Sequence, residues 1–238
     1  SIIESIGGDA YKRYRIYEAR DAAGGTWDLF RYPGVRSDSD MHTLGFDFEP
    51  WLHEHAIADG PAILEYLNRI VDERGIRPNI RFGLHVLSAN WDSASACWTV
   101  TSRGADDRET VLTSRWLYFA SGYYDYDNPH DPAIPGLAAF KGEVIHPQFW
   151  PEHFEYAGKR VVVVGSGATA VTIVPAMAQG AGQVTILQLT PTCYGIRPSR
   201  DDLGNRLLRW LPENLAWWIN RERSQRLRLR TLVTHLDT

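Results

Sequence analysis

Residues 165–170 combine types and spacing that suit the binding of a dinucleotide. They read Gly-Ser-Gly-Ala-Thr-Ala, a G-x-G-x-x-A pattern that follows four consecutive valines and opens a predicted helix. Gly165 allows a tight turn, Gly167 lets the backbone approach a diphosphate, and Ala170 is small enough for close packing of helix on strand. The start of such a helix also offers free N–H groups to phosphates. We therefore expect a nucleotide here; the alternative is a tight strand-to-helix turn that binds no ligand.

The positions that would distinguish NADPH from NADH carry neither of the usual residues. In dinucleotide-binding folds, an acid about 20 residues after the glycines binds the ribose hydroxyl, or an arginine binds the 2′-phosphate. The corresponding residues 187–190 read Leu-Gln-Leu-Thr, and only Arg197 or Arg200 could fold back to supply a cation. We hypothesise that Leu189 weakens cofactor binding or blurs its selectivity.

Glu18 is a second candidate because it closes a short predicted strand and precedes Ala-Ala-Gly-Gly at positions 22–25. An acid at a strand end binds the ribose of a dinucleotide whose glycine loop lies about 20 residues upstream. Only 17 residues precede Glu18, and they contain no such loop. On local grounds an ordinary surface acid is therefore favoured over the end of a nucleotide site.

The predicted elements place these residues at turns. Residues 61–75 have apolar residues at helical spacing, and 159–164 is typical of a parallel strand buried on both faces. A helix at 168–179 and a strand at 183–187 complete a strand–helix–strand unit. Four strands of a small antiparallel sheet are predicted at 80–86, 89–91, 97–102 and 109–113, and further strands at 14–17 and 116–121. Residues 21–40 are predicted to form an ordered loop and 123–142 a linker.

Composition excludes several classes of protein. The 238 residues are 44% hydrophobic, and 25 Lys and Arg face 29 Asp and Glu, so we expect no nucleic-acid partner. No apolar run approaches the roughly 20 residues that span a bilayer, and residues 1–10 do not resemble a signal peptide. Cys97 and Cys193 are too few for a disulfide scaffold or a zinc ribbon. We expect no metal site and a cytoplasmic location.

Arginines gather in the predicted helical segment 201–238. They are Arg206, Arg209, Arg221, Arg223, Arg226, Arg228 and Arg230, accompanied by Trp210, Trp217 and Trp218. Such a segment either rests on an anionic membrane surface or a partner, or is the solvated face of a helix. The solvated face is favoured, so membrane contact is a minor alternative.

Three motifs together resemble a known family. Residues 24–38 fit the G-G-x-W-x-x-x-x-Y-P-G-x-x-x-D signature of Baeyer–Villiger monooxygenases, and residues 140–151 fit their F-x-G-x-x-x-H-x-x-x-W-P fingerprint. The glycine motif at 165–170 follows at the expected distance. Residues 36–40 and 43–46 are most similar to the mycobacterial branch that activates ethionamide.

The resemblance implies an α/β fold with two dinucleotide-binding, Rossmann-like domains, the first of them incomplete, and a small antiparallel sheet. Residues 1–140 would form a partial FAD-binding domain, 141–200 an NADPH-binding domain and 201–238 a helical, Arg-rich segment. The implied cofactors are FAD and NADPH, and the implied reaction inserts one oxygen atom from O2 into a ketone or oxidises a sulfide. The alternatives are a flavin monooxygenase acting on nitrogen or sulfur and a non-catalytic nucleotide-binding fragment; Trp-Pro at 150–151 favours ketone oxidation.

The resemblance also implies the residues that bind each cofactor. For FAD they are Glu18, Gly25, Thr26, Trp27, Asp28, Leu29 and Val86; beside flavin and nicotinamide, Arg36, Ser37 and Asp38; for NADPH, Gly165, Ser166, Gly167, Ala168, Thr169, Ala170 and Val171; in the fingerprint, Phe140, Gly142, His146 and Trp150. Trp27 would shield the flavin from water. Asp38 is the candidate catalytic carboxylate, although on local grounds it is an ordinary turn residue.

His146 has two alternative roles. Pro147 and Pro151 exclude a regular helix and favour extended backbone around it. A structural or domain-coupling role is therefore favoured over proton transfer.

The chain also departs from the family pattern. The phosphate loop for FAD is absent, and family members are longer and supply their catalytic arginine from a later part. The chain therefore looks like a truncated member, and we expect it to bind FAD poorly by itself and to turn over no ketone.

Overall fold

The computed structural model describes residues 14–190 and 198–236, and the chain divides into two compact units. The described part of the first unit comprises residues 31–63, 151–190 and 198–236, and that of the second comprises residues 14–30 and 64–150. Each unit joins two stretches that are far apart in sequence. Cys193 and Arg197, which the sequence analysis singled out, lie outside the described residues.

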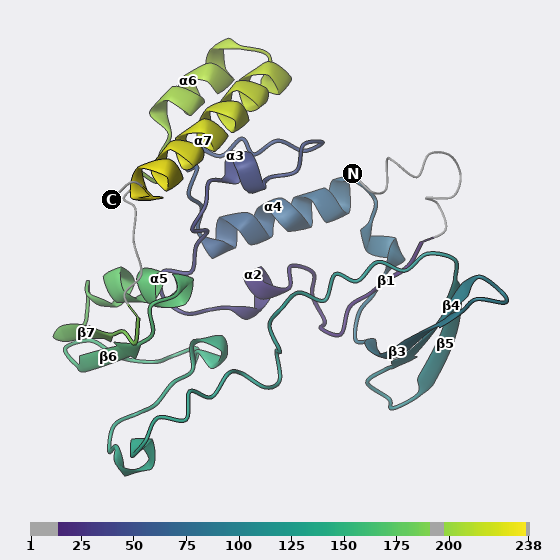
Figure 1. Cartoon of the computed structure of the whole chain (residues 1–238), viewed down its shortest axis with the longest axis horizontal. Coiled ribbons are helices and arrows are strands. Elements are labelled where there is room, and N and C mark those ends of the chain that lie inside the picture. The colour runs from purple at the N-terminus through teal and green to yellow at the C-terminus, as the bar shows by residue number, and fades with distance from the viewer. Residues whose placement is uncertain (1–13, 191–197, 237–238) are drawn as a thin grey trace. The chain divides into compact units, whose positions relative to one another are not determined.

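The second unit contains two separate sheets. Strands β1 (Ile16–Tyr17) and β2 (Ile80–Arg81) pair in parallel. Strands β3 (His85–Asp92), β4 (Cys97–Arg103) and β5 (Glu109–Ser114) form an antiparallel sheet in that order, which has three strands where four were predicted because residues 89–91 belong to β3 (Figure 1). The prediction of one strand over 80–86 is wrong, because Gly83 has a φ of +66° and breaks the extended backbone between β2 and β3.

Helix α4 (Gly60–Glu73) confirms the predicted amphipathic helix. Its first turn is capped by Asp59, whose carboxylate accepts the backbone N–H of Ala62 at 2.8 Å. Ile63, Tyr66 and Ile70 lie on one face and are buried. The chain leaves the helix at Gly75, which adopts a φ of +62°.

The first unit contains the predicted strand–helix–strand arrangement. Strands β6 (Arg160–Val164) and β7 (Gln183–Leu187) pair in parallel, and α5 (Ala168–Met177) contacts both (Figure 1). The expectation that β6 is buried on both faces is wrong: Val162 and Val164 are 62% and 52% exposed. The reason is that α5 covers one face of this two-stranded sheet, which leaves alternate valines on the other face in solvent.

Three helices complete the first unit. They are α3 (Met41–Leu44), α6 (Asp202–Trp210) and α7 (Glu213–Leu236), and α7 contacts both of the others (Figure 1). The Arg-rich segment is therefore helical, as predicted. A solvated face is the wrong interpretation for two of its arginines, because Arg221 donates to the carbonyl of Thr43 and Arg223 pairs with the largely buried Asp201. Arg226 lies at the surface and pairs with Glu222.

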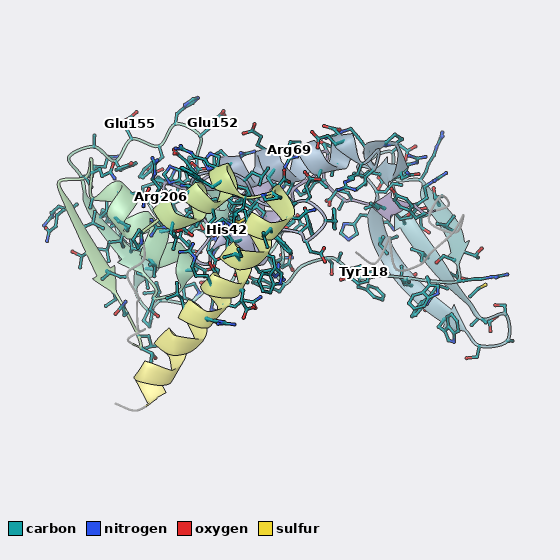
Figure 2. All side chains as sticks on the ribbon, turned by 90° about the horizontal axis from the view of Figure 1, so that it is seen from above. His42, Arg69, Tyr118, Glu152, Glu155 and Arg206 are labelled. Carbon is teal, nitrogen blue, oxygen red and sulfur yellow. The ribbon has the colours of Figure 1, made fainter. Side chains whose placement is uncertain are left out.

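The predicted strand at 116–121 is not a strand. Trp116, Tyr118 and Phe119 are 83%, 71% and 66% exposed, and Figure 2 shows the ring of Tyr118 on this irregular stretch. The composition suits a strand, but no described segment offers it a hydrogen-bonding ladder. Short 3₁₀ turns occur at Arg77–Asn79 (η2), Leu137–Ala139 (η3) and Pro147–Phe149 (η4).

Within the described ranges 14–190 and 198–236, none of the helices combines the length and the apolar character that crossing a bilayer requires.

Candidate functional site

The glycine motif forms the predicted turn between β6 and α5. Gly165 has a φ of +136°, and its N–H donates to the carbonyl of Leu187 at 2.9 Å, which ties the turn to the end of β7. Gly167 precedes the helix and lacks a side-chain cap. A Cβ at Gly167 would meet no atom within 4 Å, whereas Ala170 is buried and a Cβ at Gly165 would lie 3.9 Å from its methyl group. The turn therefore has open space beside Gly167 and close helix packing at Ala170, as a bound diphosphate requires.

The end of β7 offers little to distinguish the two nicotinamide cofactors. Leu189 is fully exposed two residues beyond the strand. The guanidinium of Arg200 is already engaged, because its Nη1 lies 3.1 Å from Glu54 Oε2 and its Nε lies 2.9 Å from Asp202 Oδ1. These pairs leave Arg200 poorly suited to bind a 2′-phosphate.

Glu18 lies at the carboxyl end of the parallel pair β1–β2. Its N–H donates to the carbonyl of Arg81, and its Oε1 accepts the N–H of Arg20 at 3.0 Å. Arg20 forms an ion pair with Asp28 of α2 (Thr26–Leu29). Ligands of open parallel sheets bind at the carboxyl ends of the strands, so Glu18 occupies the position that a ribose-binding acid needs.

The glycine turn at residues 24–29 lies next to Glu18 in the chain. Gly24 and Gly25 have φ values of +122° and +52°, which only glycine adopts readily. A Cβ at Gly24 would overlap the side chain of Leu64 on α4. Trp27 is half-buried, so part of its indole remains accessible. Val86 lies in β3 and is 40% exposed.

Tyr126 contacts this glycine turn, although the sequence analysis did not identify it. Its hydroxyl lies 3.2 Å from the hydroxyl of Thr26, and the guanidinium of Arg20 lies 5.9 Å from its ring centre. Nearby, Tyr124 packs edge-on against Phe30, with ring centroids 5.0 Å apart. Tyrosines in a predicted linker follow no helical or strand periodicity that would indicate a contact. The one feature of the sequence that could have drawn attention to Tyr126 is the run of four aromatic or acidic residues at 123–126.

The fingerprint residues form a turn that holds Tyr126. His146 caps η4 by accepting the N–H of Gln148 at 3.2 Å through Nδ1. Gln148 is buried and donates to the carbonyls of Asp125 and Tyr126 at 2.8 and 2.9 Å. His146 thus has a structural contact, in line with the favoured interpretation of that residue.

The remaining fingerprint positions are more exposed. Phe140 is 60% exposed, and its ring lies so close to Gly142 that a Cβ at Gly142 would come within 2.6 Å of the ring atom Cε1. Trp150 directly follows η4 and is half-buried.

Residues 36–38 lie in the first unit beside the start of α4. Ser37 is buried, its N–H donates to the carbonyl of Ala58 at 2.8 Å, and its hydroxyl accepts the N–H of Ala58 at 3.1 Å. Arg36 forms an isolated bridge to Asp59 through the backbone, and the side chains of Arg36 and Asp38 are exposed. The hydroxyl of Ser37 therefore has a structural partner, whereas Arg36 and Asp38 are accessible to a ligand.

The Tyr-Pro-Gly part of the signature contacts the helix of the glycine motif. Gly34 has a φ of +80° and lies against the carbonyl of Thr172 on α5. A groove of about 320 Å3 opens beside this contact, and its lining includes Gly34, Arg36, His53, His55, Asp59 and Thr172. The Tyr-Pro-Gly segment of the signature and the helix of the glycine motif thus meet within one unit.

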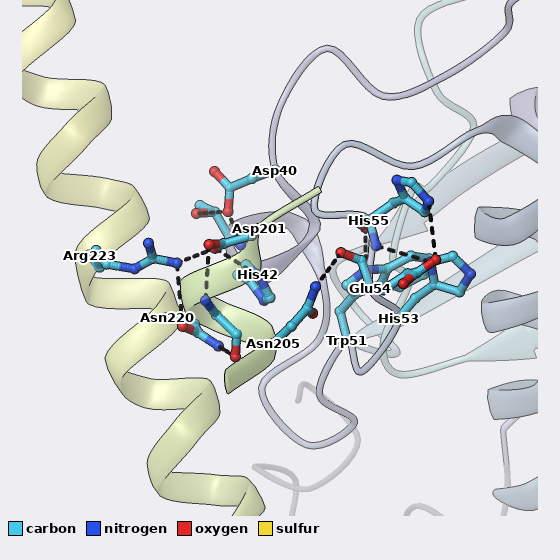
Figure 3. Close-up of polar contacts among 12 residues, drawn as sticks. Asp40, His42, Trp51, His53, Glu54, His55, Asp201, Asn205, Asn220 and Arg223 are labelled. Atoms are coloured by element: carbon cyan, nitrogen blue, oxygen red, sulfur yellow. Dashed lines mark hydrogen bonds and ion pairs between the residues drawn. The ribbon is translucent and has the colours of Figure 1, made fainter. Parts of the chain in front are cut away.

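A buried polar network ties α6 and α7 to α3 (Figure 3). Asp201 Oδ2 lies 3.6 Å from Nε2 of His42, whose side chain is 1% exposed. The carboxylate of Asp201 also forms an ion pair with Arg223 of α7. Burial alone would raise the pKa of Asp201. The neighbouring His42 ring, the N–H of Gly204 and the Arg223 guanidinium outweigh that effect and hold this pKa well below its ordinary value.

The structure thus gathers the predicted residues into two groups, one in each unit. In the second unit, Tyr126 contacts Thr26 and the Arg20 guanidinium that pairs with Asp28, and Gln148 beside the fingerprint histidine holds the carbonyl of Tyr126. In the first unit, Gly34 lies against α5, and Arg36 lines the adjoining groove. Among residues 14–190 and 198–236, no cluster of three or more His, Cys, Asp or Glu is arranged to hold a metal ion.

Comparisons with known proteins agree with these motifs. A model of the flavin-binding monooxygenase-like family matches residues 44–195. The FAD-containing monooxygenase EthA of Mycobacterium tuberculosis (strain ATCC 25618 / H37Rv) is 51% identical over 87% of this chain and 42% of its own length. The probable FAD-binding monooxygenase AlmA of Acinetobacter baylyi is 45% identical over 90% of this chain and 43% of its own length. The chain therefore spans less than half the length of these curated relatives.

Solved structures give the same picture. An oxidised steroid monooxygenase bound to NADP superposes with a TM-score of 0.69 and 30% identity, over 87% of this chain and 39% of the other. A cyclohexanone-bound cyclohexanone monooxygenase superposes with a TM-score of 0.60 and 32% identity, over 71% and 32%. These likenesses concern a mixed α/β arrangement that contains the small sheets described above.

Proposed function

Because the chain belongs to the flavin-binding monooxygenase-like family, we propose that it is part of an FAD- and NADPH-dependent enzyme that inserts oxygen from O2 into ketones or oxidises sulfides. One observation carries the proposal. Each unit has a parallel pair of strands with a glycine turn near its carboxyl end, at Gly25 in one unit and at Gly165 in the other. Two nucleotides are what a flavin enzyme that consumes a nicotinamide cofactor must bind.

The residues at both turns fit the proposed cofactors. At the NADPH turn, the open space at Gly167 admits a diphosphate close to the backbone, and the uncapped start of α5 presents its N–H groups to it. The proposed contacts are Gly165, Ser166, Gly167, Ala168, Thr169, Ala170 and Val171. At the FAD turn, Glu18 accepts a ribose hydroxyl, and the contacts along the ring system come from residues 25–29 and Val86.

The two cofactors supply hydride transfer and oxygen activation, and the chain supplies binding, orientation and shielding. The accessible part of Trp27 excludes water from the flavin. Arg36 and Asp38 are both exposed on the first unit, and Asp38 is the proposed catalytic carboxylate. We assign residues 1–140 to FAD, 141–200 to NADPH and 201–238 to a helical extension.

Two other functions are compatible with the same motifs. A flavin monooxygenase that acts on nitrogen or sulfur would share both turns, and a non-catalytic nucleotide-binding fragment would keep them without turnover. Trp-Pro at 150–151 favours ketone oxidation. Product formation from a cyclic ketone separates the two enzymes, and NADPH oxidation with FAD present separates either enzyme from the fragment.

Titration of NADPH against Gly167→Ala tests the proposal at its most open position. The chain should fold normally, because the new methyl group meets no protein atom within 4 Å and the φ of Gly167 is an ordinary −80°. NADPH affinity should fall about tenfold, because the methyl group overlaps the diphosphate. Nicotinamide fluorescence measures the affinity, and circular dichroism checks the fold.

Gly180→Ala is the matched control for that titration. Gly180 also lies in the first unit, and a Cβ there makes an ordinary 3.5 Å contact with Tyr156. The Gly180→Ala variant should bind NADPH with the same affinity as the natural chain. Equal affinities for all three proteins, or no saturable binding by the folded natural chain, would contradict the NADPH assignment.

Leu189→Arg should increase the preference for NADPH over NADH. Leu189 is fully exposed just after β7, where a guanidinium would face the 2′-phosphate without disturbing any packing. A charge-assisted contact of this kind corresponds to about a tenfold gain for NADPH and none for NADH. Parallel titrations of both cofactors measure the ratio, with Leu189→Gln as the uncharged control. An unchanged ratio of NADPH affinity to NADH affinity would count against position 189 as the one that contacts the 2′-phosphate.

A further inference from the structure

Gln148 of the fingerprint is buried in the second unit, with 5% of its surface exposed. Its carboxamide nitrogen donates to the carbonyl of Asp125 at 2.8 Å and to that of Tyr126 at 2.9 Å. Residues 123–126 form neither helix nor strand, so these carbonyls have no secondary-structure ladder to satisfy them. One side chain therefore fixes the two consecutive peptide groups on either side of Tyr126.

Tyr126, held in this way, contacts the glycine turn. Its hydroxyl lies 3.2 Å from the hydroxyl of Thr26. A Cβ at Gly25 would lie 3.3 Å from the same hydroxyl, so the turn and the tyrosine are in close contact. The guanidinium of Arg20, which is paired with Asp28 of the same turn, lies over the tyrosine ring.

The glycine turn needs such external support. Helix α2 has four residues and none of them is fully buried: Trp27 and Leu29 are half-buried, and the first buried apolar side chain is that of Phe30, which follows the helix. Its order rests on four backbone hydrogen bonds, which the N–H groups of Trp27, Asp28, Leu29 and Phe30 donate to carbonyls of residues 24–26. A one-turn helix of this kind opens easily in isolation because nucleation is unfavourable.

We propose that Gln148 is a positioning residue for the glycine turn at residues 24–30, and that it acts through the hydroxyl of Tyr126 on Thr26. The flavin as the ligand of that turn rests on the proposed function. The fingerprint thereby supports the flavin-binding turn from within the second unit, through a side chain that the signature pattern leaves unspecified.

Hydrogen exchange of the ligand-free chain tests this directly. In Gln148→Met and in Tyr126→Phe, the amides of residues 27–30 should exchange about fivefold faster, because each variant removes hydrogen bonds that hold the turn. Gln148→Met keeps the length of the side chain, and Tyr126→Phe keeps the ring under Arg20. Amides of β4 should be unchanged in both variants.

The controls and the double variant separate positioning from a general loss of structure. Gln183→Met and Tyr118→Phe change the same residue types at exposed positions and should leave residues 27–30 unchanged. If Gln148 acts through Tyr126, adding Gln148→Met to Tyr126→Phe should accelerate exchange no further. Additive effects, or acceleration spread equally over β4, would overturn the proposal.

Repeating the exchange with excess FAD links the turn to its ligand. FAD should protect residues 27–30 in the natural chain and protect them less in Gln148→Met. Full protection in that variant would overturn the role of Gln148 in the flavin site. Because the chain is expected to bind FAD weakly, the FAD concentration is raised until the protection of the natural chain no longer increases. A natural chain that shows no protection at any FAD concentration would contradict the flavin assignment, whereas exchange without ligand decides the positioning role separately.

Discussion

Gly34→Ala is expected to lower the free energy of unfolding of the first unit by about 2–4 kcal/mol, because backbone strain and overpacking act together. Gly34 adopts a φ of +80°, which an L-residue with a side chain rarely adopts. A Cβ at this position would also overlap the carbonyl of Thr172 and come within 2.8 Å of the Cβ of Ala176, both on α5. Helix α5 cannot yield to the new methyl group, because Ala170, Ile173 and Met177 anchor it on its buried face.

Urea unfolding followed by circular dichroism and tryptophan fluorescence measures this loss. Gly158→Ala is the matched control, since Gly158 lies in the same unit at a φ of +68° and a Cβ there meets nothing within 4 Å. It isolates the strain of about 1 kcal/mol from the contact. Equal losses of unfolding free energy for the two variants would show that a glycine is needed at position 34 only for its backbone conformation. Its close contact with α5 would then contribute nothing.

Local patterns predicted the elements that form from neighbouring residues. The valine run, the G-x-G-x-x-A turn and the following helix appear where the sequence places them, as β6, Gly165 and α5. The apolar spacing over 61–75 gave α4. In each case the backbone bonds and the glycine conformations are decided within about 15 residues.

Patterns failed where a second segment must be present. Residues 116–121 have the composition of a buried strand but no partner strand within the described residues, and the outer face of β6 has no covering layer there. Pairing and burial are properties of two segments, and the periodicity of one segment cannot report them.

The same limit applies to the candidate site. The end of a predicted strand pointed to Glu18, and the family signatures pointed to Gly25, Thr26 and the fingerprint. The contact of Tyr126 with Thr26, by contrast, spans 100 positions of sequence. His42 and Asp201 are likewise brought together from distant parts of the chain. Neither contact has a local spacing that would have marked it.

Asp201→Ala is expected to cost the first unit about 3 kcal/mol, the order found when one partner of a buried ion pair is removed. The carboxylate is 12% exposed and contacts three groups: Arg223, His42 and the N–H of Gly204. Its loss leaves those groups in a region where Nδ1 of His42 and Nε of Arg223 already lack partners. Helices α6 and α7 should then separate from α3 more readily, which urea unfolding at neutral pH measures.

Acid should produce the same loss in the natural chain. The pKa of Asp201 is lowered in the folded state, so this carboxylate binds a proton less readily in the folded protein than in the unfolded chain. In the unfolded chain the carboxyl titrates at about 3.9. The stabilisation is therefore fully present above the pKa of the unfolded carboxyl, and it is lost progressively as the pH falls from there towards the lower pKa of the folded state. Unfolding curves from about pH 6 down to about pH 2 should show a steeper loss of stability for the natural chain than for Asp201→Ala, with the difference concentrated below the unfolded pKa.

Glu222→Gln is the matched control for Asp201→Ala, because it also removes a carboxylate that pairs with an arginine of α7. In this case both partners lie at the surface of α7. Arg226 and Glu222 are 74% and 39% exposed, so their pair should contribute about 0–1 kcal/mol and leave the pH dependence intact. If Asp201→Ala cost no more than Glu222→Gln, the network would not be the anchor of α7. Its arginines would then act as solvated charges, as their sequence alone suggests, and the packing of α7 would have to rest on its buried small residue Ala216 and its other contacts.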